Sequence, residues 1–333
     1  MQKLRQQLPI ILAFITLLSS TTNTFAQDAP KRCRYINSTK LQIELTNQQA
    51  FVIGSVNQKA AKLLVDTGSY NTVIGYNFAK KNELVLAHTD TISYGIGGET
   101  REYKTKLQEF SIGTIKGGQT LLKVGSENAT ETYDGLIGAD FLYQSDLEIA
   151  VNQGVLRFFT PQNCENSYLA YWDKNANEVD LELGYKYDAR PSFFVTINGQ
   201  RVRTILDTGA QATIINEETA RSLGMKFSTL SQHQGSAVGI GKRTMKIQAA
   251  SFEKFQIGEE LIENAMISVG DLWANSKLDK TSPEITSHLK DSAQLILGMD
   301  FIREHRILVA LSQRKIYMSY LGGPLFMSAE KDN

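Results

Sequence analysis

The 333-residue sequence has little of several residue types on which common protein chemistries depend. It contains two cysteines and no Cys-x-x-Cys pair, so thiol redox chemistry and a cysteine zinc site find no support. Its four histidines are scattered without metal-ligand spacing, and no Ser-His-Asp set can be assembled from them. Lys plus Arg and Asp plus Glu number 35 each, with no long run of one sign. We therefore expect no metal, no cofactor and no nucleic-acid partner.

Long hydrophobic runs are missing too, apart from one near the N-terminus. Residues 1–26 begin with Lys3 and Arg5, continue with a short apolar stretch and end on small residues at Ala26. This pattern is typical of a secretory signal peptide. The apolar stretch is short for a membrane span, although a retained anchor is the alternative interpretation. We expect an exported protein, periplasmic or secreted, with no membrane span once the signal is removed.

The sequence does contain an internal duplication. Asp-Thr-Gly occurs at Asp66-Thr67-Gly68 and again at Asp207-Thr208-Gly209, each time after an apolar run typical of a buried strand. In both halves a helix-like segment, a glycine-rich hairpin tip and an apolar-Gly segment follow in the same order. Two copies in matched surroundings are not a chance occurrence. They indicate two similar halves that bring two carboxylates to one pseudo-twofold axis.

Short strands, frequent turns and few helices predict an all-β fold. The expected boundaries are a signal peptide 1–26, an N-terminal domain 33–164, a linker 165–179, a C-terminal domain 180–322 and a tail 323–333. A polar insertion at 271–292 is expected to be a surface loop.

The two cysteines, Cys33 and Cys164, stand just outside the ends of the first repeat. In an exported protein they can pair, and the disulfide would close a long loop. Two free thiols are the alternative, which is less common outside the cytosol.

These segments resemble the pepsin and retropepsin superfamily of aspartic proteases, over nearly all of the chain after the signal. The Asp66 loop is similar to the first active-site loop, and Ile92 to Gly97 looks like the flap with its tyrosine at Tyr94. The segments Asp134 to Gly138 and Leu295 to Arg303 are similar to those that end the two domains. The resemblance implies a bilobal fold of two duplicated β-barrel-like domains with the active-site cleft between them. Each half has about the length of a retropepsin subunit, so we expect a single-chain monomer. The polar linker is long enough to leave open the alternative that each half pairs with its counterpart in another chain.

The resemblance also assigns the site residues. Asp66 and Asp207 are the expected catalytic pair, and Thr67 and Thr208 are expected to hydrogen-bond across the pseudo-axis. The active-site loops comprise Thr67, Gly68, Ser69, Thr208, Gly209 and Ala210. The expected flap and substrate-binding residues are Tyr94, Gly95 and Gly97, with Gly239 and Gly241 in the reduced second hairpin. Asp140 and Asp300 are expected to have structural roles as caps at short helix starts.

Two adjacent carboxyls can hydrolyse a peptide bond without a metal, because they share one proton and their pKa values split. One carboxyl takes a proton from water and the other donates one to the scissile carbonyl. We therefore expect an aspartic endopeptidase that acts on extended polypeptides. The alternative is a catalytically silent peptide-binding module with the same fold. Ala210 stands where the first loop has Ser69, whose hydroxyl is expected to contact the adjacent aspartate, so the two carboxyls are predicted to have unequal surroundings.

Overall fold

The computed structural model describes residues 32–95, 98–125, 133–182, 190–229, 234–237, 244–272 and 293–328, with the backbone alone for 90–95, 98–101 and 328. The predicted signal peptide, nearly all of the insertion at 271–292 and the end of the tail at 323–333 lie outside the described residues. No helix in the described part of the chain has the length and apolar character needed to cross a bilayer.

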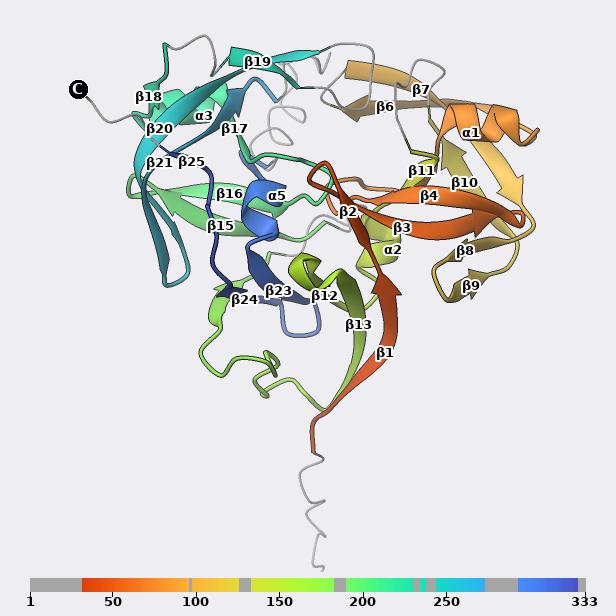
Figure 1. Cartoon of the computed structure of the whole chain (residues 1–333), viewed down its shortest axis with the longest axis horizontal. Coiled ribbons are helices and arrows are strands. Elements are labelled where there is room, and N and C mark those ends of the chain that lie inside the picture. Colours follow the sequence, from red (N-terminus) through yellow and green to blue (C-terminus); the bar gives the residue numbers. More distant parts are fainter. Residues whose placement is uncertain are drawn as a thin grey trace, which may run out of the picture. The chain divides into compact units, whose positions relative to one another are not determined.

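The first half consists almost entirely of strands (Figure 1). Its elements are β1 (Arg34–Gln42), β2 (Glu44–Thr46), β3 (Gln49–Val56), β4 (Lys59–Val65), β5 (Val73–Ile74), α1 (Tyr76–Lys81), β6 (Ala87–Gly95), β7 (Gly98–Leu107), β8 (Phe110–Ile112), β9 (Ile115–Gly117), β10 (Thr120–Val124), β11 (Gly135–Ile137), α2 (Ala139–Leu142), β12 (Asp146–Ala150), the 3-10 helix η1 (Val151–Gln153) and β13 (Val155–Gln162).

The second half repeats this arrangement. Its elements are β14 (Asn177–Asp180), β15 (Ser192–Ile197), β16 (Gln200–Leu206), β17 (Ile214–Asn216), α3 (Glu217–Ser222), β18 (Lys226–Phe227), β19 (Gln234–Ala237), β20 (Met245–Ile257), β21 (Glu260–Gly270), β22 (Leu295–Leu297), α5 (Met299–Ile302), β23 (His305–Ala310), β24 (Lys315–Tyr320) and β25 (Met327–Ser328). The prediction of an all-β fold is confirmed.

The hairpins that lead into the two Asp-Thr-Gly loops are built alike. β3 and β4 are joined by Asn57 and Gln58, and β15 and β16 by Asn198 and Gly199; all four have positive φ angles. Two successive positive φ angles are typical of the tight turn whose twist matches that of an antiparallel strand pair. β4 and β16 then have the same burial pattern, exposed at the turn and fully buried at the end. The buried ends anchor the loops that follow.

Each half has its own sheet. The strand order is β6-β7-β10-β5-β11-β4-β3-β8-β9 in the first half and β18-β20-β15-β16-β22-β17-β21-β25 in the second. In both, the strand before Asp-Thr-Gly runs parallel to the strand of the apolar-Gly segment, as β4 with β11 and β16 with β22. The next short strand pairs antiparallel with that same strand, as β5 with β11 and β17 with β22. The topology around the two loops is therefore duplicated.

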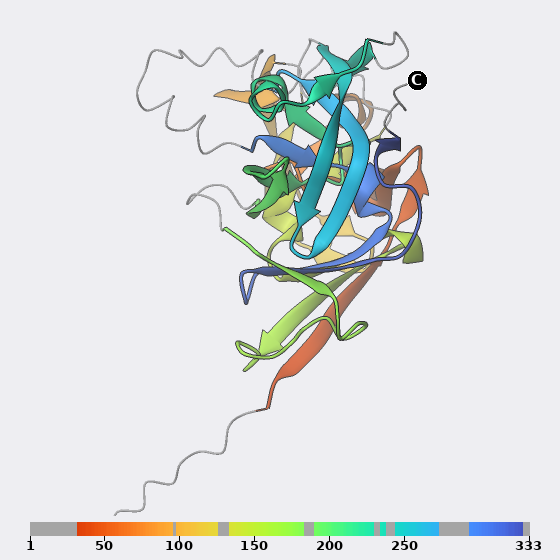
Figure 2. The same cartoon turned by 90° about the vertical axis from the view of Figure 1, so that its left-hand side faces the viewer.

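A third sheet is shared by the two halves, in the order β1-β13-β12-β23-β24-β14. Its central pair joins β12 of the first half to β23 of the second, with Leu147 opposite Val309 and Ile149 opposite Ile307. Figure 2 shows β1 and β13, in orange and green, side by side in this sheet. The end of the segment predicted as a linker forms β14, which pairs with β24. The two halves are thus connected by backbone hydrogen bonds between their strands as well as by the covalent chain.

The segment 165–176 covers one face of the shared sheet. Leu169, Ala170 and Ala176 pack there against apolar residues of both halves, including Phe159 of the first half and Tyr317 of the second. A disulfide joins Cys33 before β1 to Cys164 after β13, as the cysteine positions predicted.

A buried charge also lies in the shared sheet. Glu148 of β12 is fully buried and is paired with Arg157 of β13 and Arg306 of β23. Tyr171 donates a hydrogen bond to Glu148 at 2.6 Å, which ties the covering segment to both halves. A buried carboxylate with this many donors is satisfied, and removal of a partner would be costly.

Candidate active site

The two aspartates occupy matching positions after β4 and β16. The backbone N–H of Asp66 donates to the carbonyl of Ile137 at 3.0 Å, and that of Asp207 donates to the carbonyl of Leu297 at 3.0 Å. Each aspartate is therefore fixed by the strand that belongs to the apolar-Gly segment of its own half. Both side chains are only partly exposed.

Each carboxylate accepts two backbone hydrogen bonds from its own loop. Asp66 Oδ1 accepts from Gly68 N at 3.0 Å and from Ser69 N at 2.9 Å. Asp207 Oδ1 accepts from Gly209 N at 2.8 Å and from Ala210 N at 3.1 Å. The two carboxyls also hydrogen-bond to one another, so they form one pair.

The two glycines of the triplets are explained by this contact between the loops. A β-carbon on Gly68 would lie 2.2 Å from Cγ of Asp207, and one on Gly209 would lie 2.6 Å from Cγ of Asp66. Neither glycine has a positive φ angle, so backbone freedom is not the reason for it. Each glycine is needed because the aspartate of the other half packs directly against it.

The threonines lock the two loops together. Thr67 N donates to Thr208 Oγ1 at 3.1 Å, and Thr208 N donates to Thr67 Oγ1 at 3.0 Å. The Thr67 hydroxyl donates to the carbonyl of Leu206 at 2.9 Å, and the Thr208 hydroxyl donates to that of Val65 at 2.6 Å. Both threonines are fully buried. The two loops therefore hold each other through four hydrogen bonds that cross between the halves.

Burial and proximity shift the pKa values of the pair. Burial raises the pKa of Asp66 well above its usual range, and the neighbouring Asp207 raises it further, against the backbone donors Ser69 and Gly68. Burial also raises the pKa of Asp207, while its backbone donors, its hydrogen bond with Asp66 and the charge of Arg190 lower it. Two carboxyls at this separation cannot both ionise readily, so the pair retains one proton over part of the acid range.

Ser69 does not contact the aspartate through its hydroxyl, contrary to the expectation from sequence. Its Oγ donates to the carbonyl of Asn71 at 3.0 Å, and a serine hydroxyl has a single proton to donate. Only the backbone N–H of Ser69 reaches Asp66, as that of Ala210 reaches Asp207. The difference between serine and alanine at this position therefore changes no hydrogen bond to either carboxylate.

Asp140 and Asp300 have structural roles, although their main partner is not the helix that each begins. Asp140 Oδ1 accepts from the N–H and the hydroxyl of Thr72, both at 2.8 Å. Asp300 Oδ1 accepts from the N–H and the hydroxyl of Thr213 at 2.9 and 2.7 Å. Each carboxylate ties a short helix, α2 or α5, to the chain that follows Asp-Thr-Gly.

Arg190 was not identified from the sequence. Its Nη1 donates to the carbonyl of Gly68 at 3.0 Å, and its guanidinium lies 3.6 Å from the centre of the Tyr70 ring. It stands just before β15, and the repeat offset of 141 residues aligns it with Gln49. A position-by-position comparison of the two repeats places an arginine opposite a glutamine here. This difference in charge is visible in the sequence and could have identified Arg190.

The first hairpin is formed by β6 and β7, which pair antiparallel with Tyr94 opposite Glu99 and Gly95 opposite Gly98. The backbone of Tyr94 and Gly95 therefore lies next to the hairpin tip. The Tyr94 side chain and Gly97 lie outside the described residues, and so do Gly239 and Gly241 of the second hairpin. The roles expected of these residues stay predictions.

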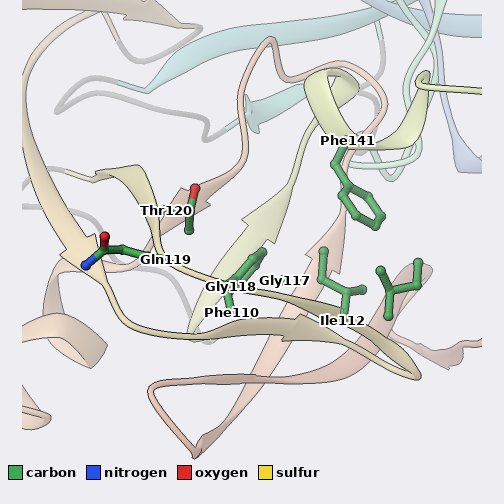
Figure 3. Close-up of a pocket in the computed structure, with 8 residues that line it drawn as sticks. Phe110, Ile112, Gly117, Gly118, Gln119, Thr120 and Phe141 are labelled. Carbon is green, nitrogen blue, oxygen red and sulfur yellow. The ribbon is translucent and has the colours of Figure 1, made fainter.

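A separate hollow of about 300 Å³ lies beside β8 and β9 (Figure 3). It is lined by apolar and neutral side chains, including Phe110, Ile112 and Phe141, and by the backbone of Gly117 and Gly118. No titratable group lines it, so it provides no acid or base for hydrolysis.

Comparisons with known proteins identify the family of the chain. A family model described as aspartyl protease matches residues 52–141 and 194–301, which together make up more than half of the chain. The DNA damage-inducible protein 1 of Kluyveromyces lactis is 25% identical over 165 residues, which are 47% of this chain and 35% of that protein. The UBA domain-containing protein Mud1 of Schizosaccharomyces pombe is 26% identical over 117 residues, 35% of this chain and 29% of that protein.

The chain thus matches about a third of the length of these curated relatives. Among solved structures, an aspartic proteinase from Irpex lacteus aligns with 85% of this chain and 97% of its own, at 12% identity and a TM-score of 0.49. The extent of the family match, together with two Asp-Thr-Gly loops locked face to face, shows that the chain belongs to the aspartyl protease family.

Proposed function

We propose that the protein is an exported aspartic endopeptidase in which Asp66 and Asp207 activate water with one shared proton. The observation that supports this most directly is the reciprocal packing of the two loops, in which each aspartate lies against the glycine of the other half. Two aspartates in unrelated turns would not be expected to pack against each other's loops in this way. The hydrogen bond between the two carboxyls and their raised pKa values fit a dyad that is ready to exchange protons.

The reaction needs no group beyond the dyad and water. The ionised carboxylate takes a proton from water as the water oxygen attacks the scissile carbonyl carbon, and the protonated carboxyl gives its proton to the carbonyl oxygen. In the second step the C–N bond breaks, the first carboxyl returns its proton to the leaving nitrogen, and the second recovers a proton from the tetrahedral hydroxyl. The backbone N–H donors to Asp66 and Asp207 hold both carboxyls in place throughout.

The substrate is an extended polypeptide, because antiparallel hairpins offer backbone groups that pair with a strand. A monomer is the proposed active form, since the threonine lock and the shared sheet connect the two halves within one chain. The disulfide fits an exported protein, because such bonds persist in oxidising compartments. The serine-to-alanine difference between the two loops removes no hydrogen bond to either carboxylate.

The test is hydrolysis of a reduced, carboxymethylated protein by the chain without residues 1–26, from pH 3 to pH 8. Product peptides are identified by mass spectrometry, with and without a pepstatin-like inhibitor. We expect cleavage by the wild type and none above background by Asp66→Asn or Asp207→Asn. Asp180→Asn is the matched control, since Asp180 is exposed on β14 and its loss should leave cleavage intact.

Full activity in either dyad variant would contradict the proposal, and peptide binding without products in the wild type would favour the silent module. Export is tested separately, by fractionation of cells that express the full chain. N-terminal sequencing of the exported form should find residue 27 first.

A further inference from the structure

We propose that Arg190 is a positioning residue that orients the Asp66 carboxyl through the peptide bond between Gly68 and Ser69. The arginine belongs to the second half of the chain and the peptide to the first, so one half completes the active-site loop of the other. The role rests on the proposed function, because it explains how one carboxyl of that mechanism is held for the reaction.

The Gly68–Ser69 peptide is held at both of its polar ends. Its N–H donates to Asp66 Oδ1 at 2.9 Å, and its C=O accepts from Arg190 Nη1 at 3.0 Å. The peptide unit is planar and trans, so its N–H and C=O point in opposite directions. A donor that fixes the direction of the carbonyl therefore also fixes the direction of the N–H that holds the carboxylate.

The positive charge of Arg190 strengthens this arrangement. A hydrogen bond from a guanidinium to an oxygen acceptor is charge-assisted and about twice as strong as a bond between neutral groups. It draws electron density toward the carbonyl oxygen, which makes the N–H of the same peptide a better donor. The cation thus acts on the Asp66 carboxyl through one peptide unit.

The same loop holds the guanidinium in place. The guanidinium carbon lies 3.6 Å from the centre of the Tyr70 ring, a distance at which a cation and an aromatic face attract. Tyr70 follows Ser69 directly, so Arg190 contacts the residues on both sides of the one whose N–H it orients. Arg190 is half-buried, and its planar guanidinium is pre-organised, so little further ordering is needed to form the hydrogen bond.

The loop of Asp207 provides an internal comparison. Its Gly209–Ala210 peptide also donates to the aspartate, from Ala210 N to Asp207 Oδ1 at 3.1 Å. Within the described ranges no side chain donates to the carbonyl of that peptide, and the repeat offset of 141 residues places Gln49 where the second half has Arg190. The two loops therefore share the N–H bond to the carboxylate and differ in what holds the carbonyl behind it.

The next peptide of each loop is held alike, which isolates this difference. Ser69 O accepts from Ala139 N at 2.9 Å, and Ala210 O accepts from Met299 N at 2.8 Å. These donors are the first residues of α2 and α5, so each loop is anchored by a short helix of its own half. Arg190 gives the first loop an additional support that comes from the other half.

A fixed peptide matters because the reacting carboxyls must keep their orientation while protons move between them, water and the substrate. Without Arg190 the Gly68–Ser69 peptide can rotate, and Asp66 Oδ1 then loses the fixed direction of one of its two backbone donors. A carboxyl that is displaced by a fraction of an ångström from the productive geometry reacts more slowly. We therefore expect the loss of Arg190 to slow the chemical step.

The first readout is amide hydrogen exchange of the 15N-labelled protein, which needs no turnover. Arg190→Met removes the charge and the donors but keeps a long side chain. The Ser69 amide should exchange about tenfold faster than in the wild type, because a hydrogen bond to a charged group contributes at least the free energy of such a change. The Ala210 amide is the internal control and should keep its rate. Arg190→Lys retains a charged donor and should restore most of the protection at Ser69.

The second readout is the hydrolysis of a peptide chosen from the cleavage products. In Arg190→Met, kcat and kcat/KM should fall together by about tenfold with KM unchanged, as expected when an interaction that matters only in the transition state is lost. Arg190→Lys should recover most of this rate. The matched control is Arg201→Met, since Arg201 is an exposed arginine that also stacks on a ring, that of Phe194, at 3.9 Å. It should match the wild type in both readouts.

Equal acceleration of exchange at Ser69 and Ala210 would indicate a general loss of stability and would overturn the inference. An unchanged Ser69 amide, or faster exchange at Ser69 with an unchanged kcat, would overturn it as well. If the wild type hydrolyses nothing but Ser69 alone loses protection in Arg190→Met, the proposed function fails and the hold of Arg190 on the loop stands.

A second pair of variants covers the case in which Arg190→Met does not fold. Tyr70→Leu removes the ring that supports the guanidinium, and Tyr70→Phe keeps it. Faster exchange at Ser69 in Tyr70→Leu alone supports the role of Arg190, and any other result for this pair contradicts it.

Discussion

Thr67 and Thr208 form a closed exchange of hydrogen bonds across the two halves. Each hydroxyl oxygen accepts from the N–H of the other threonine, at 3.0 and 3.1 Å, and each hydroxyl donates to a carbonyl at the end of the strand on the opposite side. The two aspartates follow these strand ends directly. The relative placement of the two aspartate carboxyls therefore depends on a contact that neither half can make alone.

The first prediction concerns this lock. Thr67→Val keeps the size of the side chain but leaves the Leu206 carbonyl and the Thr208 N–H without their buried partners. We expect the free energy of unfolding to fall by about 2–3 kcal/mol, the cost of buried polar groups left unpaired. The rate of hydrolysis should fall by more than the loss of folded protein explains, because the geometry of the dyad loosens. Urea denaturation and kcat/KM measure the two effects, and Thr67→Ser should retain most of both.

The second prediction concerns the glycines that face the aspartates. A methyl group in Gly209→Ala would be 2.6 Å from Cγ of Asp66, so the two loops must separate. We expect hydrolysis to drop below detection and the unfolding free energy to fall by about 1–3 kcal/mol, as for other overpacked sites. Gly118→Ala is the control, since nothing lies within 4 Å of its added carbon. Activity in Gly209→Ala close to that of the wild type would mean that the observed loop contact is not needed for the reaction.

The third prediction follows from the raised pKa of Asp66. Because the folded state holds this proton more tightly than the unfolded state, it binds more protons at a given pH, and stability falls as pH rises. The loss begins near the ordinary aspartate pKa of about 4 and continues up to the raised folded value. Asp66→Asn removes this titration, so we expect the variant to be about 1–2 kcal/mol more stable than the wild type near neutral pH. Melting temperatures from pH 3.5 to pH 8 provide the measurement.

Asp146 and Asp300 also have pKa values raised by burial, so they should contribute the same slope with pH in both proteins. The raised pKa of Asp207 is coupled to Asp66, so the substitution alters it too and the comparison reports the pair. The informative quantity is the difference in melting temperature between the wild type and Asp66→Asn. This difference should grow with pH and then level off. A constant difference would show that Asp66 titrates as it does in the unfolded chain.

Local pattern in the sequence was sufficient to predict the all-β class, the duplication and the residues that form the centre of the site. Asp66 and Asp207 follow buried strands, and their repetition implied that they meet. Features that depend on contacts between the halves were beyond local pattern. The shared sheet is one such feature, because nothing in the sequences of the strands β12 and β23 indicates that they pair with each other. The acceptor of the Ser69 hydroxyl, which is the carbonyl of Asn71 in the same loop, was not predicted from the sequence either.

Arg190 was missed for a related reason. An arginine before a strand is an ordinary surface residue in sequence, and its importance comes from the loop of the other half that it reaches. The repeat offset links it to Gln49, but a difference between repeats indicates a site only when the surrounding symmetry is known.

The fourth prediction concerns the disulfide between Cys33 and Cys164, which are 131 residues apart. In the chain-entropy description, a cross-link that closes so long a loop restricts the unfolded chain by about 4–5 kcal/mol at 25 °C. The folded state has its own connections at this place, since β1 pairs along its length with β13. We therefore expect the double variant Cys33→Ser, Cys164→Ser to fold, to retain hydrolysis at 25 °C, and to unfold at a much lower urea concentration. Equal midpoints for the oxidised wild type and the double variant would contradict this account, and a reduced wild type should behave as the double variant does.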